Sequence, residues 1–146
     1  MRALGIDLGT KRIGVALADS AGTLATPYEV VQRSGDRARD HRRIAELAAE
    51  TEAVQLVVGL PLSLDGTEGP AARSALAEAD ELRVATGLPV VTWDERFTTV
   101  SAERDLMLMD MKADARRRVV DKVAAAVMLQ AWLDHRRLTS PEDPPA

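Results

Sequence analysis

The chain of 146 residues has the size of one domain, and 46% apolar residues are enough to build a core. Charged residues make up 29%, and the net charge of −4 gives no indication of nucleic-acid binding. The absence of cysteine excludes disulfides and thiolate chemistry, and 3% aromatic residues argue against base-stacking platforms. No apolar run precedes the first strand or approaches membrane-spanning length, so we expect a cytoplasmic protein.

Three strands are predicted between residues 3 and 32. They cover Ala3–Gly9, Arg12–Ala18 and Thr26–Gln32. Only Thr10-Lys11 separates the first two strands, and Asp19-Ser20-Ala21-Gly22 has the composition of a turn. Because links this short join antiparallel neighbours, we expect the three strands to form an antiparallel unit.

Helices and strands then alternate. The predicted elements are a helix over Asp36–Thr51, a strand over Val54–Leu60, a helix over Pro70–Thr86 and a strand over Pro89–Trp93. The strand that Pro61 ends is almost continuously apolar, which is typical of a parallel strand buried on both faces. Gly87 is a plausible C-cap for the second helix.

Two further helices are predicted near the C-terminus. One runs from Thr98 or Thr99 to Met109, and a charged connection over Asp110–Ala115 leads to a long helix over Arg116–Arg137. Residues 138–146 contain three prolines and are expected to be a disordered tail. The order βββαβαβαα predicts a single α/β domain over residues 1–137, with a five-stranded mixed sheet and helices on both faces.

Asp7 carries a charge inside the otherwise apolar first strand. On that strand it shares a face with Ala3, Gly5 and Gly9, while the larger apolar side chains point the other way. Buried carboxylates are paired or bind metals, and the small neighbours would leave room for a metal ion and a ligand backbone. A salt bridge with Arg12, or a position at the end of the strand, accounts for Asp7 equally well.

Other carboxylates are expected near Asp7, because open α/β sheets gather the C-terminal ends of parallel strands at one edge. Asp94 and Glu95 come at the end of the fifth strand, and since adjacent residues face opposite ways, only one should point with Asp7. Asp121 lies in line with an apolar helical stripe that includes Ala125, so it should face inward. It would serve there as a ligand or pair with a neighbouring basic residue.

Carboxylates without a histidine or cysteine cluster suit Mg²⁺ or Mn²⁺. Two such ions about 3.5–4 Å apart can activate water and stabilise the leaving oxygen of a phosphodiester. His41 and His135 lie on charged predicted helices and are expected to be exposed. The basic stretch over 33–43 could hold phosphates or form a solvated helix face. The cations expected to grip a nucleic-acid backbone are Lys11, Arg12, Arg96, Arg116, Arg117 and Arg118.

Four motifs carry a family resemblance. They are Gly5-Ile6-Asp7-Leu8-Gly9-Thr10-Lys11-Arg12-Ile13-Gly14-Val15-Ala16, Val58-Gly59-Leu60-Pro61 with Gly66 after it, Asp94-Glu95-Arg96-Phe97-Thr98-Thr99, and Asp121-Lys122-Val123-Ala124-Ala125. In this order, over residues 3–134, the chain resembles the YqgF family of pre-16S rRNA nucleases, also described as Holliday junction resolvase-like proteins.

The resemblance implies a ribonuclease H-like fold and a metal-dependent phosphodiesterase site. By motif match, Asp7, Glu95 and Asp121 would be its catalytic and metal-binding acids, while spacing alone does not choose between Asp94 and Glu95. The implied role is processing of the 5′ end of 16S rRNA precursors in the cytoplasm. Resolution of four-way DNA junctions is an inference from fold similarity. The implied partners are therefore structured RNA or branched DNA, bound by a monomer or a homodimer.

Two other functions stay open from the sequence. The basic stretches would equally serve a weakly catalytic nucleic-acid-binding regulator. Ile6-Asp7-Leu8-Gly9-Thr10 also resembles the phosphate loop of the actin and heat-shock-protein ATPase fold. That fold closes two matching halves over a nucleotide, and this chain has no second such motif and is too short for both halves.

Overall fold

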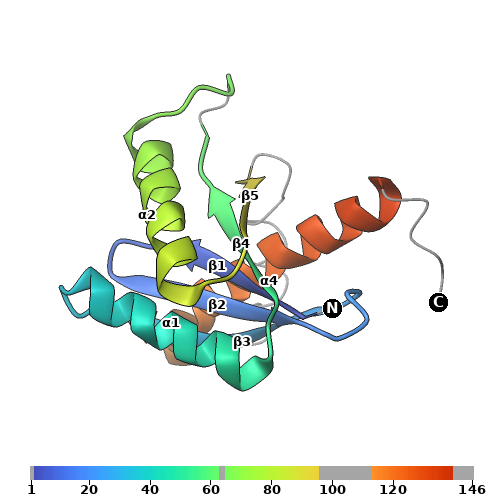
Figure 1. The fold of residues 1–146 in the computed structure, drawn as a ribbon, viewed down its shortest axis with the longest axis horizontal. Helices are drawn as coiled ribbons and strands as arrows, with labels where there is room; N and C mark the ends of the chain where they lie inside the picture. Colours follow the sequence, from blue (N-terminus) through green and yellow to red (C-terminus); the bar gives the residue numbers. More distant parts are fainter. Residues whose placement is uncertain (1, 63–64, 96–112, 140–146) are drawn as a thin grey trace.

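The computed structural model describes residues 2–62, 65–95 and 113–139, in which a five-stranded sheet is flanked by helices (Figure 1). The strands are β1 (Ala3–Leu8), β2 (Arg12–Ala18), β3 (Ala25–Gln32), β4 (Gln55–Leu60) and β5 (Val90–Asp94). The helices are α1 (Arg37–Thr51), α2 (Pro70–Thr86) and α4 (Ala113–Thr139). None of the helices described is long and apolar enough to cross a membrane.

The sheet has the strand order β3-β2-β1-β4-β5, which confirms the predicted mixed sheet. The tight links make β1, β2 and β3 antiparallel neighbours, whereas the crossovers through α1 and α2 make β4 parallel to β1 and β5 parallel to β4. Ile6 pairs with Val58, and Leu60 pairs with Asp94. The C-terminal ends of β1, β4 and β5 therefore meet at one edge of the sheet.

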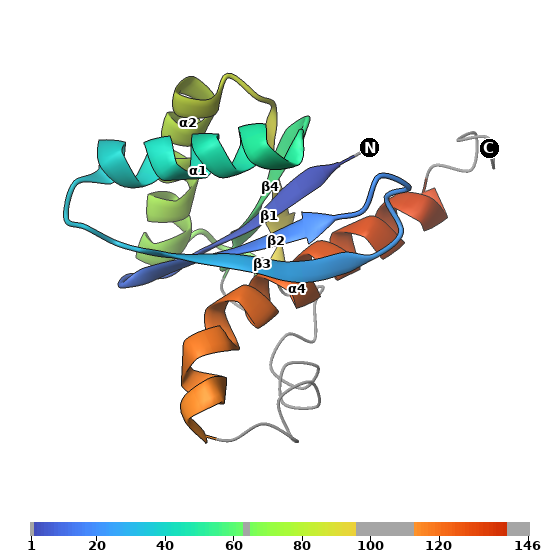
Figure 2. The same cartoon turned by 90° about the horizontal axis from the view of Figure 1, so that it is seen from below.

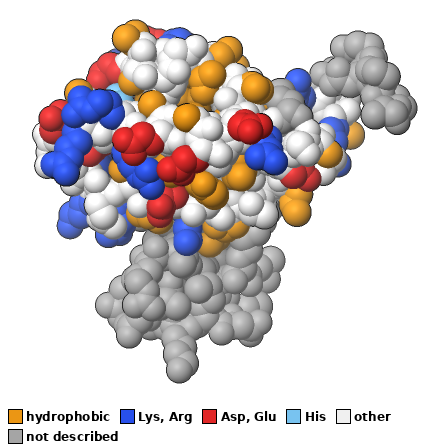
Figure 3. Space-filling model, turned by 60° about the horizontal axis from the view of Figure 1, so that its bottom comes forward, with side chains coloured by type: hydrophobic (Ala, Val, Ile, Leu, Met, Phe, Trp, Pro, Cys, Tyr) orange, Lys and Arg blue, Asp and Glu red, His pale blue; other side chains and the backbone are white. Residues whose placement is uncertain are grey.

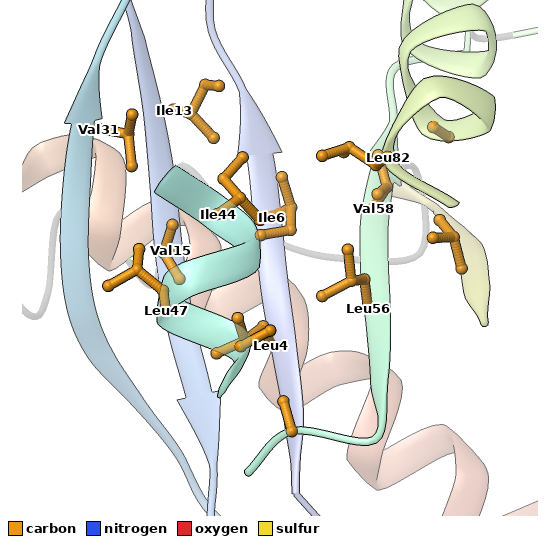
Figure 4. Close-up of a cluster of buried hydrophobic side chains, with 14 residues drawn as sticks. Leu4, Ile6, Ile13, Val15, Val31, Ile44, Leu47, Leu56, Val58 and Leu82 are labelled. Atoms are coloured by element: carbon orange, nitrogen blue, oxygen red, sulfur yellow. The ribbon is translucent and has the colours of Figure 1, made fainter. Parts of the chain in front are cut away.

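Helices cover both faces of the sheet, as predicted: α1 and α2 lie on one face and α4 on the other (Figure 2). The apolar side chains of β4 contribute to the cores on both faces of the sheet. Leu56 and Val58 join the core beneath α1 and α2, where Ile44 of α1 also packs (Figure 4). Val57 points to the opposite face and packs with residues of α4. The strand is therefore buried on both sides, which explains its nearly continuous hydrophobicity.

Gly5, in the middle of β1, allows α4 to approach the sheet closely. A Cβ at this position would lie 2.8 Å from the Leu129 Cβ and 3.2 Å from the Ala125 carbonyl oxygen. The expectation that Gly5 leaves room for a ligand is therefore wrong, because α4 fills that space. Glycine is required at position 9 for a different reason. A Cβ there would lie 2.5 Å from the Arg12 carbonyl oxygen, across a tight turn.

Element boundaries differ from the predicted ones by a few residues. β1 ends at Leu8 because Gly9 already belongs to the turn. α1 begins after Asp36, whose side chain caps it by accepting from two backbone N–H groups, as a Ser, Thr or Asp cap does. α4 begins at Ala113 and ends at Thr139, beyond the predicted range at both ends. Alanine favours helix, and an acid in the first turn suits the helix dipole. The predicted helix over 98–109 and residues 140–146 lie outside the described ranges.

Candidate active site

A cleft of about 860 Å³ opens at the edge of the sheet where β1 and β4 end. Asp7 and Glu95 line it together with the loop over residues 9–12 that connects β1 to β2. The opposite walls come from the start of α1 and the first half of α2. The location is the one expected for a ligand site in an open α/β sheet, at the C-terminal ends of the parallel strands.

Glu95 reaches the cleft over Gly59. A Cβ built on Gly59 would overlap the Glu95 carboxylate, so the bare backbone of β4 leaves the space in which that carboxylate lies. Gly59 follows Val58, the register partner of Ile6, and therefore lies beside Asp7 on the neighbouring strand. Of the two acids that the spacing left open, Glu95 lines the cleft with Asp7, whereas Asp94 completes β5.

The two cleft carboxylates influence each other. The pKa of Glu95 is raised to about 7, first by burial and then by the negative charges of Asp7 and Asp94. Partial burial and a nearby like charge both disfavour the ionised carboxylate. A cation at this point would relieve the repulsion between Asp7 and Glu95, so the electrostatics of the pair favour binding of a positively charged ligand.

The predicted phosphate-binding cations are only partly described. Lys11 and Arg12 line the same cleft as Asp7. Lys11 is exposed, and its side chain forms no hydrogen bond or ion pair within the described ranges. Arg96 lies outside those ranges. The backbone of residues 116–118 forms part of the first half of α4, but their side chains are not described.

Asp121 is also placed only by its backbone. It lies on α4 one turn before Ala125, the residue whose carbonyl oxygen packs on Gly5. Further along α4, the Gln130 side chain accepts a hydrogen bond from the Ala25 backbone, at the sheet end where β1 begins. The first half of α4 therefore lies toward the end of β1 that carries Asp7 (Figure 2). Among the described side chains, no group of three or more acids or histidines could hold a metal.

One wall of the cleft is a buried ionic network that sequence analysis missed. The Arg33 guanidinium donates two hydrogen bonds of 2.9 Å to the Glu78 carboxylate, and His41 Nε2 lies 2.7 Å from it. Arg37 approaches the same carboxylate at 3.3 Å. His41 and Glu78 are each only 3% exposed, so the expectation that His41 is exposed is wrong. His135 is exposed, as predicted.

The Glu78 carboxylate stays charged despite its burial. Burial by itself raises its pKa, but the hydrogen bonds from Arg33 and His41 and the charges of Arg33 and Arg37 outweigh this and bring it to about 2. The signal was available in the sequence: Glu78 lies three residues after Ala75, and His41 three before Ile44, so both continue the apolar stripes of their helices.

A sequence model of the RuvX family, described as Holliday junction resolvase, matches residues 1–135. The chain belongs to this family. RuvX is another name for the YqgF family, so the match confirms the resemblance carried by the four motifs.

Relatives of this RuvX-family chain include proteins named "Putative pre-16S rRNA nuclease" from three bacteria. The Leifsonia xyli protein is 50% identical over 137 residues, which cover 94% of this chain and 88% of that protein. The Mycobacterium ulcerans protein is 52% identical over 139 residues, which cover 93% of this chain and 80% of that protein. The Myxococcus xanthus protein is 45% identical over 137 residues, which cover 94% of this chain and 90% of that protein.

The fold is similar to that of a solved structure. Thermus thermophilus RuvC, determined in complex with a Holliday junction substrate, matches with a TM-score of 0.61 and 19% sequence identity. The match covers 95% of this chain and 97% of RuvC. It confirms the predicted ribonuclease H-like fold.

Three of the five arginines in the basic stretch over 33–43 of this RuvX-family chain are held in ion pairs. Arg43 forms ion pairs with three glutamates, Glu29, Glu46 and Glu50. Arg33 and Arg37 both pair with Glu78. On the face of the molecule drawn in Figure 3, basic side chains in blue are interspersed with acidic ones in red. The interpretation of a solvated, ion-paired helix face therefore fits Arg43 better than phosphate binding.

Gly59→Ala should lower activity without unfolding the protein. The added methyl displaces only the flexible end of Glu95, so we expect a stability change within about 1 kcal/mol. We also expect a roughly tenfold or greater loss of nuclease turnover, the result predicted when a carboxylate required in the cleft is displaced. Gly5→Ala is the contrasting variant. Its methyl meets α4 itself and should cost about 1–3 kcal/mol through overpacking. Urea unfolding of both variants, with turnover measured on each, checks the pair; full turnover in Gly59→Ala would contradict the role of Glu95.

Proposed function

We propose that the protein is a metal-dependent endonuclease that hydrolyses phosphodiester bonds, with Asp7 and Glu95 at its reaction centre. One observation carries this proposal: the two carboxylates line the same cleft as Lys11 and Arg12. Acids that suit a hard metal ion and cations that suit phosphates are therefore presented to the same ligand. Membership of the RuvX family supports the same chemistry.

The donor set in the cleft fits Mg²⁺ or Mn²⁺. Asp7 and Glu95 offer only oxygen ligands, and Mg²⁺ usually takes one or two protein carboxylates and keeps several waters. Burial, and then the negative charges of Asp7 and Asp94, raise the pKa of Glu95, and a bound cation would relieve the repulsion between these acids. When bound, such an ion polarises a phosphoryl oxygen and makes water a stronger nucleophile. We propose Asp121 as a third acid from its motif and its backbone position on the first half of α4.

The cations of this chain would orient the substrate. Lys11 is exposed at the cleft with no described partner, so it is available to a phosphate without breaking an ion pair. Arg12 lies next to it on the same wall. We propose the same phosphate-binding role for Arg96, which follows Glu95 in its motif, and for Arg116, Arg117 and Arg118, which precede Asp121 on α4.

The proposed substrate is precursor 16S rRNA, trimmed at its 5′ end. Relatives that share 45–52% of their residues over nearly the whole chain carry that name. A protein with this substrate acts in the cytoplasm. The description of the family as a Holliday junction resolvase favours a second candidate, the four-way DNA junction. Junction resolution requires cuts in two strands and so favours a symmetric homodimer, whereas RNA trimming does not require one.

Cleavage assays separate the candidates. The purified protein is incubated with a precursor 16S rRNA fragment and, separately, with a four-way DNA junction, each with Mg²⁺ and each with EDTA. We expect Mg²⁺-dependent cuts in the RNA and little turnover of the junction. Paired, symmetric cuts in the junction alone would favour the resolvase. Tight RNA binding without turnover under all conditions would instead indicate a non-catalytic regulator.

A further inference from the structure

Arg33 connects the active-site loop to the buried network. Its Nε donates a 2.7 Å hydrogen bond to the Gly9 carbonyl oxygen, while its two terminal nitrogens bind Glu78. Its backbone N–H donates to the Lys11 carbonyl oxygen at 3.0 Å. One residue at the end of β3 therefore contacts both the loop after Asp7 and the buried face of α2.

The loop over residues 9–12 depends on these contacts for its position. β1 ends at Leu8, so the Gly9 carbonyl lies beyond the sheet ladder and is held by Arg33. Within the loop, the Gly9 N–H donates to the Arg12 carbonyl oxygen at 3.0 Å, which closes the turn. Lys11 and Arg12 then line the cleft beside Asp7. A shift of this loop would move both cations relative to the carboxylate.

The other end of the connection is fixed by burial. Glu78 is 3% exposed and is contacted from three sides, by Arg33, His41 and Arg37. A guanidinium fork that binds a carboxylate with two parallel hydrogen bonds has one preferred orientation, which a lysine ammonium does not have. The orientation of Arg33 is therefore set by α2, and the direction of its Nε toward Gly9 follows from it.

We propose that Arg33, oriented by Glu78, is a positioning residue for the nuclease. It acts through the loop over residues 9–12, which it holds so that Lys11 meets the substrate phosphate beside Asp7. This inference rests on the proposed function. It assigns to the Arg33–Glu78 pair a role in substrate cleavage in addition to its contribution to folding.

Arg33→Lys is the variant that tests the proposal. It keeps the positive charge near Glu78 but loses the two-pronged geometry and the Nε–H directed at Gly9. We expect the value of kcat/KM for RNA cleavage to fall between about ten- and a hundredfold, since a displacement near 1 Å can cost that much. Backbone amides of residues 9–12 should exchange hydrogen faster than in the wild type. Ile44→Val, a core change under α1, is the control and should alter neither quantity.

A double-mutant cycle shows whether Arg33 acts through the loop. If it does, replacing both loop cations by Lys11→Ala and Arg12→Ala already removes what Arg33 positions, so Arg33→Lys should add less than about threefold to the defect of that doubly substituted protein. If instead the losses in kcat/KM caused by the separate substitutions multiply, Arg33 contacts the substrate itself or only stabilises the fold. Either result overturns the inference. Unchanged amide exchange in Arg33→Lys would overturn it as well and leave the proposed function standing. Absence of cleavage by the wild type would instead overturn the proposed function.

Discussion

Asp7→Asn is expected to reduce nucleolytic turnover at least about a thousandfold, because loss of the proposed metal ligand would remove several kcal/mol of transition-state stabilisation. The amide has the same size as the carboxylate and removes the negative charge that faces Glu95. The folded protein should therefore keep its thermal stability within a few degrees of the wild type. Single-turnover cleavage of precursor rRNA, together with a thermal melt, measures both quantities.

A matched control separates the loss of a ligand from the loss of a charge. Asp80 is exposed on α2, pairs with Arg83 and does not line the cleft. Asp80→Asn changes the net charge of the protein by the same amount as Asp7→Asn and should cleave RNA at the wild-type rate. Turnover by Asp7→Asn within tenfold of the wild type would mean that Asp7 is a structural acid of β1.

Glu78→Gln is expected to cost roughly 3 kcal/mol of folding free energy at neutral pH, because it leaves the guanidinium of Arg33 without its buried counter-charge. Arg33 has a side chain only 19% exposed, so water compensates little of this loss. Urea unfolding at pH 7 measures the difference. Glu46→Gln removes an exposed acid on α1, 64% accessible, and should change stability by less than about 0.5 kcal/mol.

The cost of Glu78→Gln should depend on pH in a defined direction. The pKa of Glu78 in the folded protein is about 2, below its ordinary value of 4.5. A depressed carboxylate pKa contributes stability that is complete above about pH 4.5 and is lost as the pH falls toward 2. The wild type and Glu78→Gln should therefore converge in stability over this window. An unfolding free-energy difference that stays constant from pH 7 to pH 3 would contradict the charged network.

Two glutamates in one cleft thus have opposite electrostatic environments. The pKa of Glu95 is raised by burial and by the neighbouring acids, whereas the pKa of Glu78 is lowered by the cations around it despite its burial. The first arrangement destabilises the ionised side chain and favours an incoming cation. The second arrangement is internally compensated and needs no ligand. This contrast distinguishes the candidate metal-binding acid from the acid that holds the protein scaffold.

Local patterns in the sequence were sufficient for most of the fold. The strand that Pro61 ends, the C-cap at Gly87 and the short link between the first two strands each depend on neighbours in the chain, and the structure confirms all three. The periodicity of β4, apolar at nearly every position, correctly indicated a strand buried on both faces. Such features could be predicted because their physical cause lies within a few residues.

Features that depend on packing between distant elements could not be predicted in the same way. Gly5 was expected to make room for a ligand, but only the path of α4 shows that Leu129 uses that space. The contact of His41 with Glu78 joins α1 and α2, and nothing in either helix alone pairs the two residues. Likewise, the position of Glu95 in the cleft beside Asp7 depends on the bare backbone of Gly59 on another strand.

The central claim is that Asp7 and Glu95 hold a divalent metal ion in the cleft. A crystal structure of the wild-type protein soaked in Mn²⁺, with anomalous scattering recorded at the manganese edge, tests it most directly. We expect an anomalous peak within coordination distance of both carboxylates, and no peak there in Asp7→Asn. Full manganese occupancy elsewhere on the protein, with none between Asp7 and Glu95, would contradict the claim.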